Sequence, residues 1–174
     1  MFLLPLAAAV VAGTSLSLGA GARAAGSTVP SVSCLAAIGQ ARSGRQDGYR
    51  VVLGVVSVPP GYLKQVVPTR TGPWRAWRKA GLAIRTGSAP VVVSVPRAWR
   101  KRVAITWGGT GPVEALRIEG CPPPATAWSV YAGGFYLRAP ACVPLVFRVG
   151  SRRTTVRFGV GRRCPASRSS SGTG

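Results

Sequence analysis

The most constraining feature of the chain is a series of short apolar runs separated by glycine and proline. Beyond Gly48 the runs are rich in valine and recur roughly every 8–12 residues. Short β-branched runs between turn residues are typical of strands, and only 34–41 could form a short helix. The clearest runs are 50–58, 82–86, 91–95, 102–107, 115–119, 128–137, 143–149 and 153–160. The pattern predicts an all-β fold, a disulfide-stapled antiparallel β-sandwich of about eight short strands.

The last two runs predict a β-hairpin with a defined register. Residues 149–152 (Val-Gly-Ser-Arg) place glycine first in a two-residue loop, which is typical of a type II′ turn. The expected pairs on the apolar face are Phe147 with Thr154, Leu145 with Val156 and Val143 with Phe158. On the other face Arg148 lies opposite Arg153, and Arg157 lies further along the same side. Opposed like charges destabilise a strand pair, so this basic face is a candidate binding surface.

Four cysteines indicate two disulfide bonds and an oxidising compartment. Three pairings are compatible with Cys34, Cys121, Cys142 and Cys164. Cys34 precedes the first strand-like run and Cys164 follows the last, so a bond between them would join the ends of the domain. We therefore expect Cys34–Cys164 and Cys121–Cys142. The chain has no C-x-x-C motif, which argues against a thioredoxin-like or zinc-ribbon protein.

The first residues have the layout of a secretory signal peptide. Residues 2–12 form an uncharged apolar run, shorter than the roughly 20 residues of a membrane span. Ala22-Arg23-Ala24 matches an A-x-A cleavage site, so we expect a secreted protein cleaved after Ala24; an uncleaved anchor is the alternative. The predicted organisation is a signal peptide (1–24), an N-terminal segment (25–47), the β-sandwich (48–164) and a disordered Ser/Gly tail (165–174).

The charge balance of the chain is strongly basic. There are 23 Lys and Arg residues against 3 Asp and Glu and no His, which gives a formal net charge of +20. Charges in average proteins are roughly balanced in sign, so the depletion of acids indicates either an anionic partner or surface, or an exported protein that tolerates a strong positive field. We expect an anionic cell-wall polymer or an anionic membrane surface. Non-specific nucleic-acid binding is a further alternative.

The same composition excludes most enzyme chemistry. Without histidine the chain can form neither a His-based triad nor a His-ligated metal site. The acids are Asp47, Glu114 and Glu119, and the last two point to opposite faces of any continuous strand. They could not flank one scissile bond, and no nucleophile or phosphate-loop motif is present. We expect a non-enzyme with neither metal nor cofactor.

A five-residue segment occurs twice, each time before a strand-like run. Residues 75–79 and 97–101 both read Arg-Ala-Trp-Arg-Lys. Arginine binds phosphate or carboxylate, and tryptophan stacks on bases, sugars or guanidinium groups. In the alternative interpretation the tryptophans pack at sandwich corners and the cations are merely solvated. With the hairpin, the predicted anion-binding residues are Arg75, Trp77, Arg78, Lys79, Arg97, Trp99, Arg100, Lys101, Arg148, Arg153 and Arg157.

Three segments of the chain resemble uncharacterised secreted proteins of high-GC Gram-positive bacteria. They are 48–54 (Gly-Tyr-Arg-Val-Val-Leu-Gly), 131–136 (Tyr-Ala-Gly-Gly-Phe-Tyr) and 155–164 (Thr-Val-Arg-Phe-Gly-Val-Gly-Arg-Arg-Cys). The resemblance covers about two-thirds of the chain, from Gly48 to Cys164. It implies an extracellular location and brings no activity with it.

Together these features predict a secreted, non-catalytic cationic module at the cell envelope. It would bind anionic polymers or surfaces, or serve a structural role there. The alternative is an exported protease inhibitor that presents a disulfide-framed loop, 121–142, to its target. Pro122-Pro123-Pro124 would stiffen that loop and lower the entropy lost when it binds.

Overall fold

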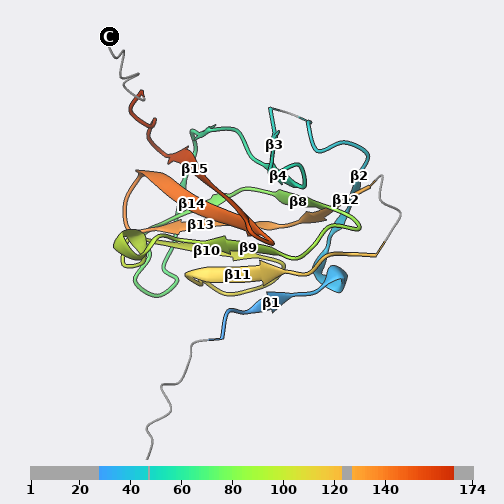
Figure 1. Ribbon diagram of the computed structural model, residues 1–174. Coiled ribbons are helices and arrows are strands. Elements are labelled where there is room, and N and C mark those ends of the chain that lie inside the picture. The colour runs from blue at the N-terminus through green and yellow to red at the C-terminus, as the bar shows by residue number, and fades with distance from the viewer. Residues whose placement is uncertain (1–27, 47, 123–126, 167–174) are drawn as a thin grey trace, which may run out of the picture.

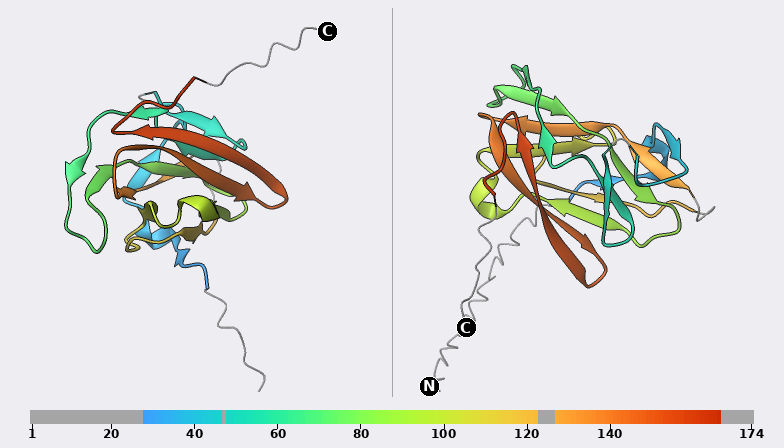
Figure 2. Two further views of the ribbon diagram at one scale, coloured as in Figure 1. Left: turned by 90° about the vertical axis from the view of Figure 1, so that its left-hand side faces the viewer. Right: turned by 90° about the horizontal axis from the view of Figure 1, so that it is seen from above.

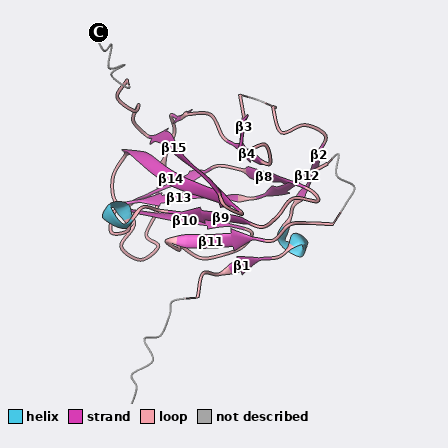
Figure 3. Ribbon diagram, viewed as in Figure 1, coloured by secondary structure: helices cyan, strands magenta, loops and turns pink. Residues whose placement is uncertain are grey.

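The valine-rich runs form strands, as predicted, and short turns separate them (Figures 1 and 3). The computed structural model describes residues 28–46, 48–122 and 127–166, so the predicted signal peptide and most of the predicted tail lie outside the described residues. The strands are β1 (Ser31–Val32), β2 (Gly39–Ala41), β3 (Arg50–Val52), β4 (Val56–Val58), β5 (Tyr62–Leu63), β6 (Val67–Pro68), β7 (Ala76–Lys79), β8 (Leu82–Arg85), β9 (Val91–Ser94), β10 (Val103–Trp107), β11 (Ala115–Ile118), β12 (Trp128–Tyr131), β13 (Gly133–Leu137), β14 (Ala141–Val149) and β15 (Arg152–Val160).

The strands form three hydrogen-bonded sheets. The first has six strands in the order β1-β11-β9-β14-β15-β5, the second four in the order β10-β13-β7-β6, and the third five in the order β2-β12-β8-β4-β3. Most neighbours are antiparallel, and the parallel pairs β1–β11 and β15–β5 lie at the two edges of the six-stranded sheet. The prediction of an antiparallel, sandwich-like all-β fold is confirmed. The segment before Gly48 contributes β1 and β2, so the sandwich begins earlier than predicted.

The four- and five-stranded sheets are joined by two strand pairs that pass from one into the other. β7 continues into β8 and β12 into β13, and Ala80 N–H donates to the Gly133 carbonyl (2.8 Å) where both pairs bend. A Cβ at Gly133 would lie 1.8 Å from the Thr106 carbonyl oxygen, and one at Gly134 would lie 1.9 Å from that of Arg78. Only glycine allows so close an approach of neighbouring backbones. The two sheets thus form one bent layer opposite the six-stranded sheet (Figure 2).

One apolar core fills the space between the two layers. The ring centroid of Phe135, on β13, lies 5.5 Å from that of Phe158, on β15, so these two strands face each other across the core. Trp107 packs edge-on against Phe135 at 5.8 Å, and its indole N–H donates to the Ala80 carbonyl at 2.9 Å. The buried indole therefore carries no unsatisfied donor, while full burial of each aromatic ring contributes about 1.5–3 kcal/mol.

The C-terminal hairpin has the predicted register. β14 and β15 pair antiparallel over nine positions, and Gly150 has a φ of 57°, which favours glycine in the tight turn. The pairs Phe147–Thr154, Leu145–Val156, Val143–Phe158 and Arg148–Arg153 all occur. The predicted short helix over 34–41 is reduced to one 3₁₀ turn, η1 (Cys34–Ala36), followed by β2.

The predicted disulfide pairing is wrong: the bonds are Cys34–Cys121 and Cys142–Cys164. The parallel pairing of β1 with β11 aligns Val32 with Ile118, which brings the two cysteines that follow these strands together. At the open end of the hairpin, β14 and β15 run side by side, so Cys142 reaches Cys164 with a Cα–Cα distance of 4.8 Å. Each disulfide therefore links the ends of neighbouring strands instead of the ends of the domain.

Candidate cationic binding site

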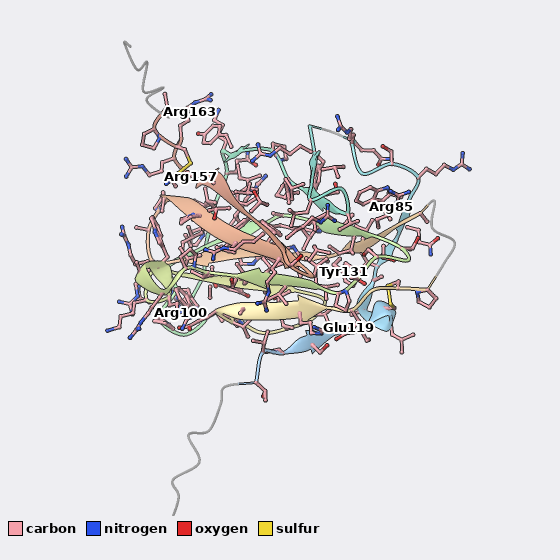
Figure 4. The ribbon with its side chains drawn as sticks, in the orientation of Figure 1. Arg85, Arg100, Glu119, Tyr131, Arg157 and Arg163 are labelled. Carbon is pink, nitrogen blue, oxygen red and sulfur yellow. A yellow bond between two sulfur atoms is a disulfide. The ribbon has the colours of Figure 1, made fainter. Side chains whose placement is uncertain are left out.

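The outward face of the C-terminal hairpin carries unpaired basic charge. Arg148 and Arg153 are directly opposite each other and are both exposed. Arg157 lies four residues further along β15, opposite Pro144, and is exposed on the same face (Figure 4). Because side chains alternate along a strand, these arginines point away from the core that Phe158 and Val156 enter.

The second Arg-Ala-Trp-Arg-Lys segment lies next to this hairpin. β9 pairs with β14, aligning Val92 with Arg148 and Ser94 with Val146, and the chain then enters the 3₁₀ helix η2 (Arg97–Trp99). A groove of about 440 Å³ lies between η2 and the hairpin. We call it the arginine groove; it is lined by Val92, Ser94, Val95, Pro96, Arg97, Arg100, Val146, Arg148 and Arg153. Segments about fifty residues apart thus supply four arginines to one recess.

The carboxylates of the described residues neutralise little of this charge. Glu114 Oε2 lies 3.2 Å from Arg100 Nε, but the two side chains are 46% and 53% exposed. Such a solvated pair contributes at most about 1 kcal/mol. Glu119 lies outside the groove, where it accepts hydrogen bonds from Ser31 and Arg117, and these two hydrogen bonds lower its pKa. Among the described residues, no carboxylate forms a salt bridge with the other three arginines of the groove.

The first Arg-Ala-Trp-Arg-Lys segment lies elsewhere, on β7 in the opposite layer. Strand alternation places Arg75, Trp77 and Lys79 on the outward face of the four-stranded sheet. Arg78 is paired with Phe135 on the inward side, and its Nε is enclosed without a hydrogen-bond partner among the described residues. The structure therefore separates Arg78 from the other predicted cations of its segment.

The tryptophans of the two segments are only partly exposed. Trp99 packs against the core, and the guanidinium of Arg102 lies 4.6 Å from the centre of its ring. Trp77 is half-buried beside Tyr136, with ring centroids 6.4 Å apart. Trp99 thus has the packing role that was the alternative to stacking on a ligand, whereas Trp77 lies on the outward face of its sheet. Lys101 is exposed but does not line the arginine groove.

Sequence reasoning missed the floor of the groove and one arginine near the predicted ones. Ser94 and Val146 form part of the floor, and Arg117 lies in line with Val92 and Arg148 across three strands. No local motif marks these residues. They become neighbours only through the order β11-β9-β14, which joins strands that are not consecutive in the chain.

The loop proposed for protease inhibition lacks the frame that motivated it. Cys121 and Cys142 are each bonded to another cysteine, so no disulfide closes residues 121–142, and Pro123 and Pro124 lie outside the described residues. The described part of the chain also contains no group of three or more His, Cys, Asp or Glu residues that could hold a metal ion. No helix in that part is long and apolar enough to cross a membrane.

Comparisons of the chain with protein-family models, with curated proteins and with solved structures find no match. The interpretation of the arginine groove therefore depends on its geometry and its charge.

Proposed function

We propose that the protein is a secreted, non-catalytic module of the cell envelope whose arginine groove binds linear anionic polymers. The observation that carries this proposal is the convergence of Arg97 and Arg100 with Arg148 and Arg153 on one recess. Two disulfide bonds indicate an oxidising compartment. A formal net charge of +20 would attract polyanions at long range.

The chemistry of the groove suits phosphate groups. Guanidinium groups form short, charge-assisted hydrogen bonds with phosphate, often two at a time. An anion placed between Arg148 and Arg153 would replace their mutual repulsion with attraction. Val92, Ser94 and Val146 place no charge on the floor, and Glu114, which pairs with Arg100, does not line the groove.

The position of the groove favours a polymer over a bilayer surface. Four arginines line a recess. A flexible polymer chain can enter this recess more deeply than the headgroups of a flat bilayer can. Peripheral membrane proteins usually insert apolar side chains next to their cations. Among the described residues, the most exposed large apolar side chains are Leu35 (96%) and Ile38 (69%), which lie in and just beyond η1 and do not line the groove. A phosphate-bearing wall polymer is therefore the proposed ligand.

The proposal is tested by titrating the protein with a purified phosphodiester wall polymer over a series of salt concentrations. A double variant, Arg148→Ser with Arg153→Ser, should bind at least about tenfold more weakly, because removing each charged hydrogen bond costs about 1 kcal/mol or more. The slope of log K against log salt should fall by about one to two, since fewer counterions are released.

The matched control is Arg42→Ser with Arg45→Ser, which removes the same charge from two exposed arginines outside the groove. This control should keep nearly the affinity and the salt slope of the wild type. Equal losses in both double variants would show that net charge, and not the arginine groove, determines binding. Anionic vesicles bound as tightly as the polymer would instead favour a membrane partner.

A further inference from the structure

A second cluster of arginines lies at one end of the four-stranded sheet. Val103, Leu137 and Ala76 are aligned on β10, β13 and β7, and all three are buried in the core. The residue next to each of them is an arginine, and these three exposed residues form what we call the arginine row: Arg102, Arg138 and Arg75. Strand alternation points the row outward.

Backbone hydrogen bonds hold the arginine row together. Arg138 N–H donates to the Arg102 carbonyl at 3.1 Å, and Arg75 N–H donates to the Leu137 carbonyl at 2.9 Å. Neighbouring strands lie about 4.8 Å apart, so the row extends over roughly 10 Å. That length would allow successive phosphates of one chain to meet successive arginines.

The surroundings of the row restrict its side chains and leave its charge unbalanced. Arg102 is stacked over the ring of Trp99 at 4.6 Å, which limits the freedom that its side chain would lose on binding. Trp77 and Tyr136 occupy the next outward positions on β7 and β13. The salt bridges among the described residues involve only Arg100 and Arg117. Like charges on neighbouring strands are destabilising, and a bound anion would reverse this effect.

The arginine row and the arginine groove lie on the outer faces of different layers, and the turn that contains η2 connects them at one end of the sandwich, where Arg100 and Arg102 are two residues apart. The groove is on the outer face of the six-stranded sheet, and the row is on the outer face of the layer across the core. Phe135, on one layer, and Phe158, on the other, meet between these two faces. A short polymer segment that lies along one of these faces therefore cannot lie along the other at the same time.

We propose that the arginine row is a second binding site for a linear phosphate polymer, so that one molecule bridges two polymer chains. The inference takes the class of ligand from the proposed function and adds that each protein molecule has two binding sites for it. Binding through two sites on the outer faces of different layers would cross-link long chains and raise the avidity for a dense polymer layer.

The experiment uses inorganic polyphosphate of two lengths as the probe. A short, monodisperse polyphosphate is titrated by calorimetry to count sites, and long-chain polyphosphate is followed by light scattering to detect cross-linking. The row variant is Arg102→Ser with Arg138→Ser. A second row variant, Arg75→Ser with Arg138→Ser, keeps the contact between Arg102 and Trp99 in case the first does not fold.

The wild type should bind two short chains per molecule, and long chains should scatter strongly. Each row variant, and the groove variant Arg148→Ser with Arg153→Ser, should bind one short chain and lose the scattering. The control variant, Arg42→Ser with Arg45→Ser, should keep both properties. A row variant that keeps both sites would overturn the inference.

The remaining outcomes separate this inference from the proposed function. A wild type with a single site, lost only in the groove variant, would refute the second site and leave the proposed function standing. Losses in the groove and row variants no larger than in the control would refute both. If single-stranded DNA outcompetes polyphosphate at the row, and Trp77→Ala removes that preference, the row is a nucleic-acid site and the inference is wrong.

Discussion

Arg148 and Arg153 face each other across β14 and β15, and both line the groove that η2 borders. No carboxylate among the described residues forms a salt bridge with either. Opposed like charges on neighbouring strands cost about 0.2–1 kcal/mol. A folded domain can carry such a cost without difficulty, but nothing in the packing of the hairpin requires it. The pair therefore does not stabilise the hairpin, in agreement with the proposal that it binds an anion.

Removing this repulsion should not destabilise the protein in the absence of ligand. For Arg148→Ser with Arg153→Ser, we expect a free energy of unfolding equal to the wild-type value or up to about 1 kcal/mol higher. Urea denaturation at low salt measures the difference, and added salt should reduce it. A decrease of more than about 1 kcal/mol would mean that the two side chains stabilise the hairpin instead of straining it.

The two disulfides should differ in their contribution to stability. Cys34–Cys121 closes a loop with a sequence separation of 87, and Cys142–Cys164 one of 22. In the loop-entropy model these closures contribute about 4.5 and about 3.5 kcal/mol. Cys34→Ala with Cys121→Ala should thus lower the melting temperature more than Cys142→Ala with Cys164→Ala. Non-reducing peptide mapping checks the pairing, and a recovered Cys34–Cys164 peptide would contradict it.

The bend between the four- and five-stranded sheets should not accept a side chain. Gly133→Ala would place a Cβ 1.8 Å from the Thr106 carbonyl oxygen, so the backbones must move apart. We expect a decrease of about 3 kcal/mol or more in the free energy of unfolding. Gly39→Ala is the control, because no atom lies within 4 Å of its added Cβ. Equal stability of the two variants would show that the bend is not tightly packed.

The contact between β1 and β11 should weaken in acid. The Ser31 hydroxyl and then Arg117 lower the pKa of Glu119 below its ordinary value of 4.5. A carboxyl whose pKa is lowered by folding stabilises the protein above its unfolded pKa, and this contribution is lost as the pH falls through the folded pKa. Glu119→Gln should therefore flatten the fall in stability below about pH 4.5, as followed by thermal unfolding. An unchanged pH profile would mean that the carboxylate contributes nothing.

Local patterns in the sequence predicted the parts of the fold that depend on neighbouring residues. The Gly150 turn, the alternation of the last two runs and the Arg148–Arg153 pair are all determined within a single hairpin. The all-β fold follows similarly from the spacing of β-branched runs. These predictions needed no knowledge of how distant strands are ordered.

The order of distant strands explains what the sequence could not predict. The disulfide prediction failed because β1 lies beside β11, a parallel pairing that no local motif indicates. The arginine groove was predicted as two separate basic features, and only the β9–β14 pairing joins them. Arg78 was misplaced because the sequence does not show which face of β7 is buried. The pairing of strands that are distant in sequence thus explains both the wrong predictions and the formation of the arginine groove.

The Cys142–Cys164 bond gives the C-terminal hairpin a property that its hydrogen bonds alone would not provide. The bond lies at the open end of the two strands, and the Gly150 turn lies at the other end, beside exposed Arg152 and Arg153. A secreted protease that cuts after either arginine would break the chain between β14 and β15 but would not separate the two strands. The nicked halves would stay covalently joined, with Arg148 on one and Arg157 on the other, so the basic face could survive an environment rich in proteolytic enzymes.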